Sequence, residues 1–201
     1  MGVSRTRRFG PAMLMLACLT VGGLSAWSFL GKREGSGLGT SALASDITAS
    51  TGKAAASLGP SGLPIPRFVS LKAERVNVRR GPSNDHDVAW VFQRKGLPVE
   101  IIAEFDNWRR IRDSDGEEGW VYQSMLSGKR TALVAPWRKD DALPLYAGSD
   151  PSSGLVAKVK PGVVAPIEKC NGRWCDVTAG GYEGWIDQQM LWGVYPGEEI
   201  D

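Results

Sequence analysis

Residues with the chemistry for catalysis are few in this chain. The only histidine, His86, lies in the stretch RVNVRRGPSNDHDVAW at residues 75–90. A catalytic histidine needs a nucleophile beside it, and no Ser or Cys stands in a recognisable nucleophile motif. The pair Arg79-Arg80 does not begin a phosphate loop, because no glycine cluster followed by a helix accompanies it. We therefore interpret this stretch as a strand that leads into an exposed loop, and we expect no enzyme.

The acidic run DSDGEE, residues 113–118, has the order of carboxylates found at the start of a calcium loop. It lacks the glutamate that an EF-hand places at its twelfth position. We interpret the run as a polar hairpin turn and expect neither a metal nor a cofactor.

Aromatic residues give the best indication of a binding function. Trp108 and Trp174 each follow a polar turn, where an aromatic ring can border a groove and stack on a sugar or a peptide. Core packing explains these two tryptophans equally well, so both interpretations stay open. With Tyr146 and Tyr182 they form our candidate set of ligand-binding residues.

The N-terminal residues 1–30 contain the most apolar run of the chain, PAMLMLACLTVGGLSAWSFL at residues 11–30. Twenty uncharged residues are enough to cross a bilayer. Arg5, Arg7 and Arg8 precede the run and would stay in the cytoplasm, so the rest of the chain is expected to be exported. The apolar run is compatible with three interpretations: an uncleaved inner-membrane anchor, a cleaved signal peptide or a lipoprotein signal. Net charge is +2, which with export argues against a nucleic-acid partner.

Residues 31–66 are rich in Gly, Ser, Ala and Pro and show no hydrophobic period. Such a composition is typical of a flexible linker. A folded part is expected to begin at Arg67.

The folded part repeats itself. Trp174 stands 66 residues after Trp108, and Gly184-Trp185 stands 65 residues after Gly119-Trp120. A nearly constant offset between several landmarks indicates a duplicated module. We place the first module at residues 67–135 and the second at 136–195, with a tail at 196–201. Short runs of alternating apolar and polar residues, split by glycine and Asx turns, predict a small all-β barrel or sandwich for each.

Cys170 and Cys175 bracket the turn NGRW, which places them on adjoining strands. Because the compartments to which exported proteins go are oxidising, we predict a disulfide between them. A zinc site would need four ligands, and only two are at hand.

Three stretches resemble the bacterial SH3-like domain in its periplasmic, tandem form: LKAERVNVRRGPS, a tryptophan after a hairpin turn, and GWVYQSML. The resemblance covers residues 67–194, and it is weaker in the second module, where ALPLYAGSDP replaces RVNVRRGPS. It implies two tandem, small, partly open β-barrels after the apolar N-terminal helix and the linker. It also implies non-catalytic binding of peptidoglycan in the cell envelope. The alternative is a protein–protein or regulatory module that acts on an envelope enzyme.

Overall fold

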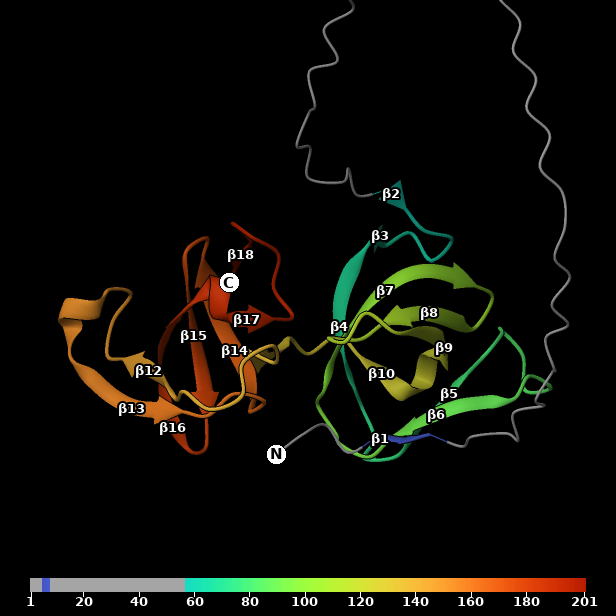
Figure 1. The fold of residues 1–201 in the computed structure, drawn as a ribbon. Coiled ribbons are helices and arrows are strands. Elements are labelled where there is room, and N and C mark those ends of the chain that lie inside the picture. Colours follow the sequence, from blue (N-terminus) through green and yellow to red (C-terminus); the bar gives the residue numbers. More distant parts are fainter. Residues whose placement is uncertain (1–4, 8–56) are drawn as a thin grey trace, which may run out of the picture. The chain divides into compact units, whose positions relative to one another are not determined.

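The structure, a computed structural model, describes residues 5–7 and 57–201 (Figure 1). Its regular elements in these ranges are strands and three short 3₁₀ turns, η1 (Gln123–Met125), η2 (Pro151–Ser153) and η3 (Gln188–Met190). The all-β class is therefore confirmed for this part of the chain. The predicted apolar helix at 11–30 and the linker up to residue 56 lie outside the described residues. Within the described ranges, no helix is long and apolar enough to cross a membrane.

Module 1, as we call residues 57–128, supplies every strand except β1 of a curled antiparallel sheet with the strand order β1-β6-β5-β9-β8-β7-β4-β10. The strands of this sheet are β1 (Arg5–Arg7), β4 (Arg67–Leu71), β5 (Val76–Arg79), β6 (Val88–Phe92), β7 (Pro98–Phe105), β8 (Trp108–Arg112), β9 (Glu118–Tyr122) and β10 (Leu126–Ser127). The predicted alternation holds in β5, where Val76 and Val78 are buried and Asn77 is exposed. Strand β1 contributes residues 5–7 by pairing with β6.

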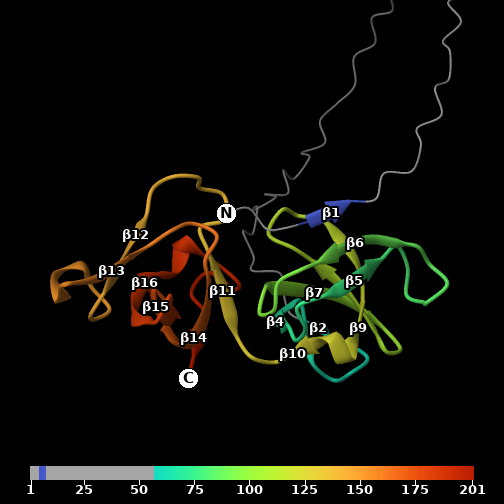
Figure 2. The same cartoon turned by 90° about the horizontal axis from the view of Figure 1, so that it is seen from below.

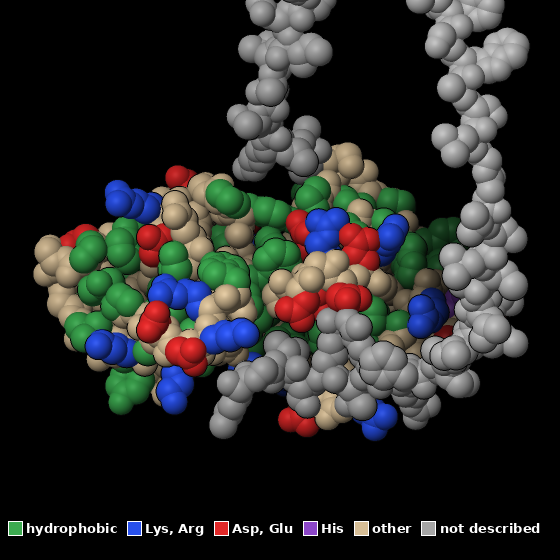
Figure 3. Space-filling model, viewed as in Figure 1, with side chains coloured by type: hydrophobic (Ala, Val, Ile, Leu, Met, Phe, Trp, Pro, Cys, Tyr) green, Lys and Arg blue, Asp and Glu red, His purple; other side chains and the backbone are tan. Residues whose placement is uncertain are grey.

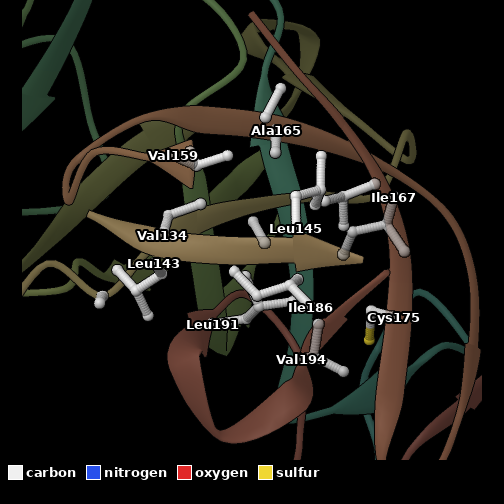
Figure 4. Close-up of a cluster of buried hydrophobic side chains, with 14 of the residues drawn as sticks. Val134, Leu143, Leu145, Val159, Ala165, Ile167, Cys175, Ile186, Leu191 and Val194 are labelled. Carbon is white, nitrogen blue, oxygen red and sulfur yellow. The ribbon is translucent and has the colours of Figure 1, made fainter. Parts of the chain in front are cut away.

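Module 2, residues 129–201, repeats this arrangement with the strand order β13-β12-β16-β15-β14-β11-β17, and β18 pairs with β14. Figure 2 labels β11 to β16 of this module. Its strands are β11 (Thr131–Val134), β12 (Leu143–Tyr146), β13 (Leu155–Val159), β14 (Val164–Asn171), β15 (Trp174–Ala179), β16 (Tyr182–Asp187), β17 (Leu191–Trp192) and β18 (Glu199–Ile200). Strand β11 lies within the range predicted for the first module, but it pairs with β14 and β17 of the second. Figure 4 shows aliphatic side chains from several of these strands meeting in the core.

A short hairpin precedes β4. Strands β2 (Ser57–Leu58) and β3 (Pro64–Ile65) pair with each other, although these residues belong to the predicted linker. The Glu104 carboxylate, whose side chain is 1% exposed, holds the hairpin by accepting hydrogen bonds of 2.8 Å from both the amide and the hydroxyl of Ser61. The guanidinium groups of Arg67 and Arg109 lie 2.7 and 3.1 Å from the same carboxylate. We call this arrangement the Glu104 clamp.

The clamp also sets the acidity of its carboxyl group. Burial by itself raises the pKa of Glu104. The hydrogen bonds from Arg67 and Ser61, with the positive charge of Arg109, outweigh burial and lower the pKa from 4.5 to about 2. The group is therefore ionised at neutral pH and in mildly acidic solution.

The two modules share contacts. The ring centroid of Phe68 lies 5.2 Å from that of Trp192 and 4.7 Å from that of Tyr195. The Tyr195 hydroxyl donates to Glu100 Oε1 at 2.9 Å, and Leu133 of β11 is buried in the hydrophobic cluster of module 1. Apolar and polar contacts thus link the modules directly.

Candidate functional site

Three aromatic residues form a row across the sheet of module 1. Phe105 at the end of β7 is paired with Trp108 at the start of β8, and Trp108 is paired with Tyr122 at the end of β9. Residues directly opposite one another in antiparallel strands lie on the same face. Phe105 is 54% exposed, Tyr122 is 39% exposed and Trp108 is 8% exposed. We call these three residues the aromatic row.

Local sequence explains why the row forms. A two-residue turn, Asp106-Asn107, closes the β7–β8 hairpin, and Asp106 adopts the positive φ of 46° that Asp tolerates better than most residues. The buried Arg109 braces this turn by donating to Asp106 O at 2.8 Å and to Trp108 O at 3.0 Å. The turn and the row beside it are therefore held in one geometry.

The 3₁₀ turn η1 fastens the other side of the row. Gln123 receives a hydrogen bond of 2.9 Å from Arg109 through its Oε1 and donates one of 2.7 Å to Asn107 through its Nε2. The Tyr122 ring meets the Trp108 ring edge-to-face, with centroids 5.4 Å apart. A fixed tryptophan flanked by two more exposed aromatic residues suits the stacking of a flat, partly apolar ligand surface.

A second row lies beside the first on the same face. Trp120 is paired with Arg79 on one side and with Arg110 on the other. Arg110 also makes an ion pair of 2.8 Å with Glu118, and Arg79 donates to the carbonyl of His86 at 2.7 Å. On the molecular face drawn in Figure 3, basic and acidic side chains are interspersed rather than gathered by sign.

The predicted site residues do not all meet. Trp108 belongs to module 1, whereas Tyr146 and Trp174 contact each other in module 2, edge-to-face with centroids 5.8 Å apart. Trp174 is only 8% exposed, as Trp108 is, so packing accounts for most of both rings. Tyr182 is 57% exposed and begins β16 beside the β15–β16 turn. The structure therefore brings two of the four residues together and leaves the other two apart.

Phe105 and Tyr122 complete the aromatic row, but the sequence did not single them out as binding residues. The signal was available for Phe105, because it stands two turn residues before Trp108 and must face it in a hairpin. To identify Tyr122 as a member of the row, one must also know the register between β8 and β9. At the matching positions in module 2, Asn171 and Asp187 flank Trp174, so that row is polar.

A tryptophan of module 2 is already covered by a charge of its own chain. Lys169 Nζ lies 5.1 Å from the centre of the Trp185 ring and 3.9 Å from Asp176 Oδ2. Burial, joined by the negative charges of Glu183 and Glu168, raises the pKa of Asp176 above its usual value, although Lys169 acts in the opposite direction. Lys169 therefore covers part of the Trp185 ring and leaves less of it for a ligand.

The structure also shows where the cysteines, the acidic run and the histidine considered in the sequence analysis lie. Cys170 and Cys175 form the predicted disulfide between β14 and β15. In the run at 113–118, Asp113 Oδ1 accepts hydrogen bonds from the amides of Asp115 and Glu117, which makes it a turn. His86 lies in the exposed loop between β5 and β6. Among residues 57–201, no group of three or more metal-ligating side chains is gathered.

Comparison with known proteins agrees with the duplicated fold. The family model described as "Bacterial SH3 domain" matches residues 72–128 and again residues 139–193. The chain belongs to this family. The two matches confirm the resemblance noted in the sequence and its tandem form.

Two solved structures also align with the chain. The structure of NlpC2 from Trichomonas vaginalis is 14% identical, with a TM-score of 0.29 over 63% of this chain and 48% of that one. The structure of NlpC1 from the same organism is 15% identical, with a TM-score of 0.29 over 68% and 48%. The chain thus spans about half the length of each. No curated protein matches the sequence.

Proposed function

We propose that this protein is a non-catalytic binding protein of the bacterial cell envelope that recognises peptidoglycan through the aromatic row of module 1. The observation that carries the proposal is the exposure of Phe105 and Tyr122 on either side of a braced Trp108. Exposed aromatic rings held in place bind with little loss of conformational entropy, and their faces suit the apolar faces of sugar rings. Membership of the bacterial SH3 family supports a binding role.

The proposed location follows from the sequence of the N-terminal part. The apolar run at 11–30 and the arginines before it would export the protein to the periplasm or anchor it in the inner membrane. An anchored chain keeps Arg5–Arg7 on the opposite side of the membrane from module 1. The β1–β6 pairing then cannot form within one molecule, and the β6 edge is uncovered.

A labelling experiment tests this topology. A single Cys placed at Thr6, in a C18S, C170S and C175S background, should react in intact cells only with a membrane-permeant maleimide. A second variant, with its single Cys at Ser83 in the exposed β5–β6 loop, should also react with an impermeant maleimide once the outer membrane is permeabilised. Labelling of position 6 by the impermeant reagent would contradict the anchored topology.

Binding itself is tested by co-sedimentation of the full-length protein, kept in mild detergent, with purified protein-free sacculi across a salt series. We expect retention at moderate salt and a loss of affinity of about 5- to 30-fold for F105A, the range of an interface hot spot. The matched control is W137A, because Trp137 is also exposed, at 57%, and lies outside the row. A protein that stays soluble at all salt concentrations would contradict peptidoglycan binding and favour an envelope enzyme as the partner.

A further inference from the structure

A groove of about 480 Å³ opens in module 2 between the β14–β15 turn, η3 and the chain after β17. Its volume falls in the range of about 300–1,000 Å³ that is usual for small-ligand sites. Its lining residues include Arg173, Asp187, Gln189, Leu191, Val194 and Pro196.

The groove holds one positive and one negative side chain. Arg173 is exposed, and the ion pairs of module 2 between described residues are made by Arg130, Arg138 and Lys169 instead. Asp187 is half-buried, and its Oδ1 accepts a hydrogen bond of 2.9 Å from the Gln189 amide. Arg173 and Asp187 are not within ion-pair distance of each other, although Asp187 is paired with the residue after Arg173, Trp174. Both charges therefore remain available to a ligand.

The floor of the groove is preformed. Gln188 is 5% exposed, donates to Glu198 O at 2.7 Å and accepts from the Gly197 amide at 2.8 Å. Its amide is thus satisfied by the chain and holds the C-terminal loop in place. Gly197 has a φ of 73° and nothing within 4 Å of the position of a Cβ, so this wall of the groove is open.

The same place in module 1 has different chemistry. Asn107 and Tyr122 stand where module 2 has Arg173 and Asp187. Asn107 accepts a hydrogen bond from Gln123 through its Oδ1, and Tyr122 belongs to the aromatic row. Duplication has therefore produced one uncharged and one doubly charged version of the same corner of the fold.

We propose that the groove of module 2 binds a short peptide that carries both a free carboxylate and a free amine. The Arg173 guanidinium would hold the carboxylate, for which its planar fork is suited, and Asp187 would accept hydrogen bonds from the ammonium group. The apolar side chains of Leu191, Val194 and Pro196 would contact the peptide between its charged ends. This inference rests on the proposed function and extends it from the glycan to the peptides of the wall.

The test is an NMR titration of the ¹⁵N-labelled full-length protein with the tripeptide N-acetyl-Ala-Lys-Ala, which has a free carboxylate and a free lysine amine. We expect shifts at the amides of Gly172, Gln189 and Gly197. R173Q and D187N should each weaken binding at least about 10-fold, as the loss of a charge-assisted hydrogen bond requires. D187N retains an oxygen that can cap Gln189. R138Q changes an exposed arginine outside the groove and should leave binding unchanged.

Blocked peptides separate the two contacts. Amidating the carboxyl end should remove the difference between the native protein and R173Q, and acetylating the lysine should remove the difference between the native protein and D187N. Shifts that lie elsewhere, or binding that neither variant changes, would overturn the inference. Loss of sacculus binding in F105A with no peptide binding would refute the groove and leave the proposed function intact. Peptide binding without any sacculus binding would refute the proposed function and leave the peptide groove of module 2 intact.

Discussion

Glu104 shows how one residue can decide where the folded part begins. Its carboxylate lies 43 residues along the chain from Ser61, yet it holds both the amide and the hydroxyl of that residue. The composition of residues 57–66 predicts a flexible linker, because Gly, Ser and Pro dominate. A carboxylate contributed by β7 overrides this local preference, and only the tertiary structure reveals it.

Acid should loosen the Glu104 clamp. The folded pKa is depressed, so the stabilisation is present above the ordinary carboxyl pKa of 4.5 and is lost as the pH falls toward about 2. E104Q should destabilise the protein by about 2–3 kcal/mol at pH 7 and by much less near pH 2. Urea unfolding at several pH values measures this difference, and an equal cost at both extremes would contradict the assignment.

The residues of the aromatic row were only partly predictable. Trp108 attracts attention because of its type and its position after a turn. The exposure of Phe105 and Tyr122 depends on the register of three strands, which no local pattern specifies. The sequence left core packing and binding open for Trp108, and the structure shows why, since its ring is largely buried but lies beside two exposed rings.

At the scale of elements, the repeated Gly-Trp landmark has a steric cause. A Cβ on Gly184 would lie 2.7 Å from the carbonyl oxygen of Tyr146, because strands β12 and β16 approach closely there. A Cβ on Gly119 of module 1 would clash with the Val78 side chain and lie 3.1 Å from the carbonyl oxygen of Arg79. The Gly-Trp pair therefore recurs in the sequence because both sheets need a glycine where two neighbouring strands approach closely.

G184A should consequently destabilise module 2 by about 1–3 kcal/mol, the usual cost of overpacking. G128A is the control, because a Cβ on Gly128 would have no neighbour within 4 Å. Thermal unfolding followed by circular dichroism gives the comparison. Equal melting temperatures for the two variants would show that the close approach is not rigid.

The β14–β15 hairpin should depend on its disulfide. Cys170 and Cys175 are 5% and 0% exposed, and they enclose a short loop. Loop-closure entropy predicts that the C170S/C175S double variant loses about 2 kcal/mol. Denaturant unfolding with and without reductant should show this loss in the native protein and no effect of reductant in the variant. A reductant effect that persists in the variant would point to Cys18 instead.

At the scale of the whole molecule, the contacts between modules predict cooperative unfolding. Phe68 of module 1 touches Trp192 and Tyr195 of module 2, and it is 7% exposed. We expect the native protein to unfold in one transition. F68A should unfold in two transitions, one for each module, because the variant lacks the aromatic contact between the modules. Calorimetry distinguishes the two outcomes. F105A is the control, since Phe105 is exposed and outside this interface.

The interface was not foreseeable from the sequence, whereas the two modules were. Strand alternation and the constant offset are local or repeated signals. The Tyr195–Glu100 hydrogen bond joins residues 95 positions apart and leaves no pattern. Even the boundary between modules shifted, because β11 pairs with β14 rather than with its sequence neighbours in module 1.

The Glu104 clamp has a mechanical consequence. If module 1 is pulled by the chain that directly precedes residue 57, the load reaches it first at the β2–β3 hairpin. The Ser61–Glu104 hydrogen bonds and the Arg67 ion pair then bear the force before any core strand does. Detaching this hairpin would free residues 57–66 while the sheet of module 1 stays folded.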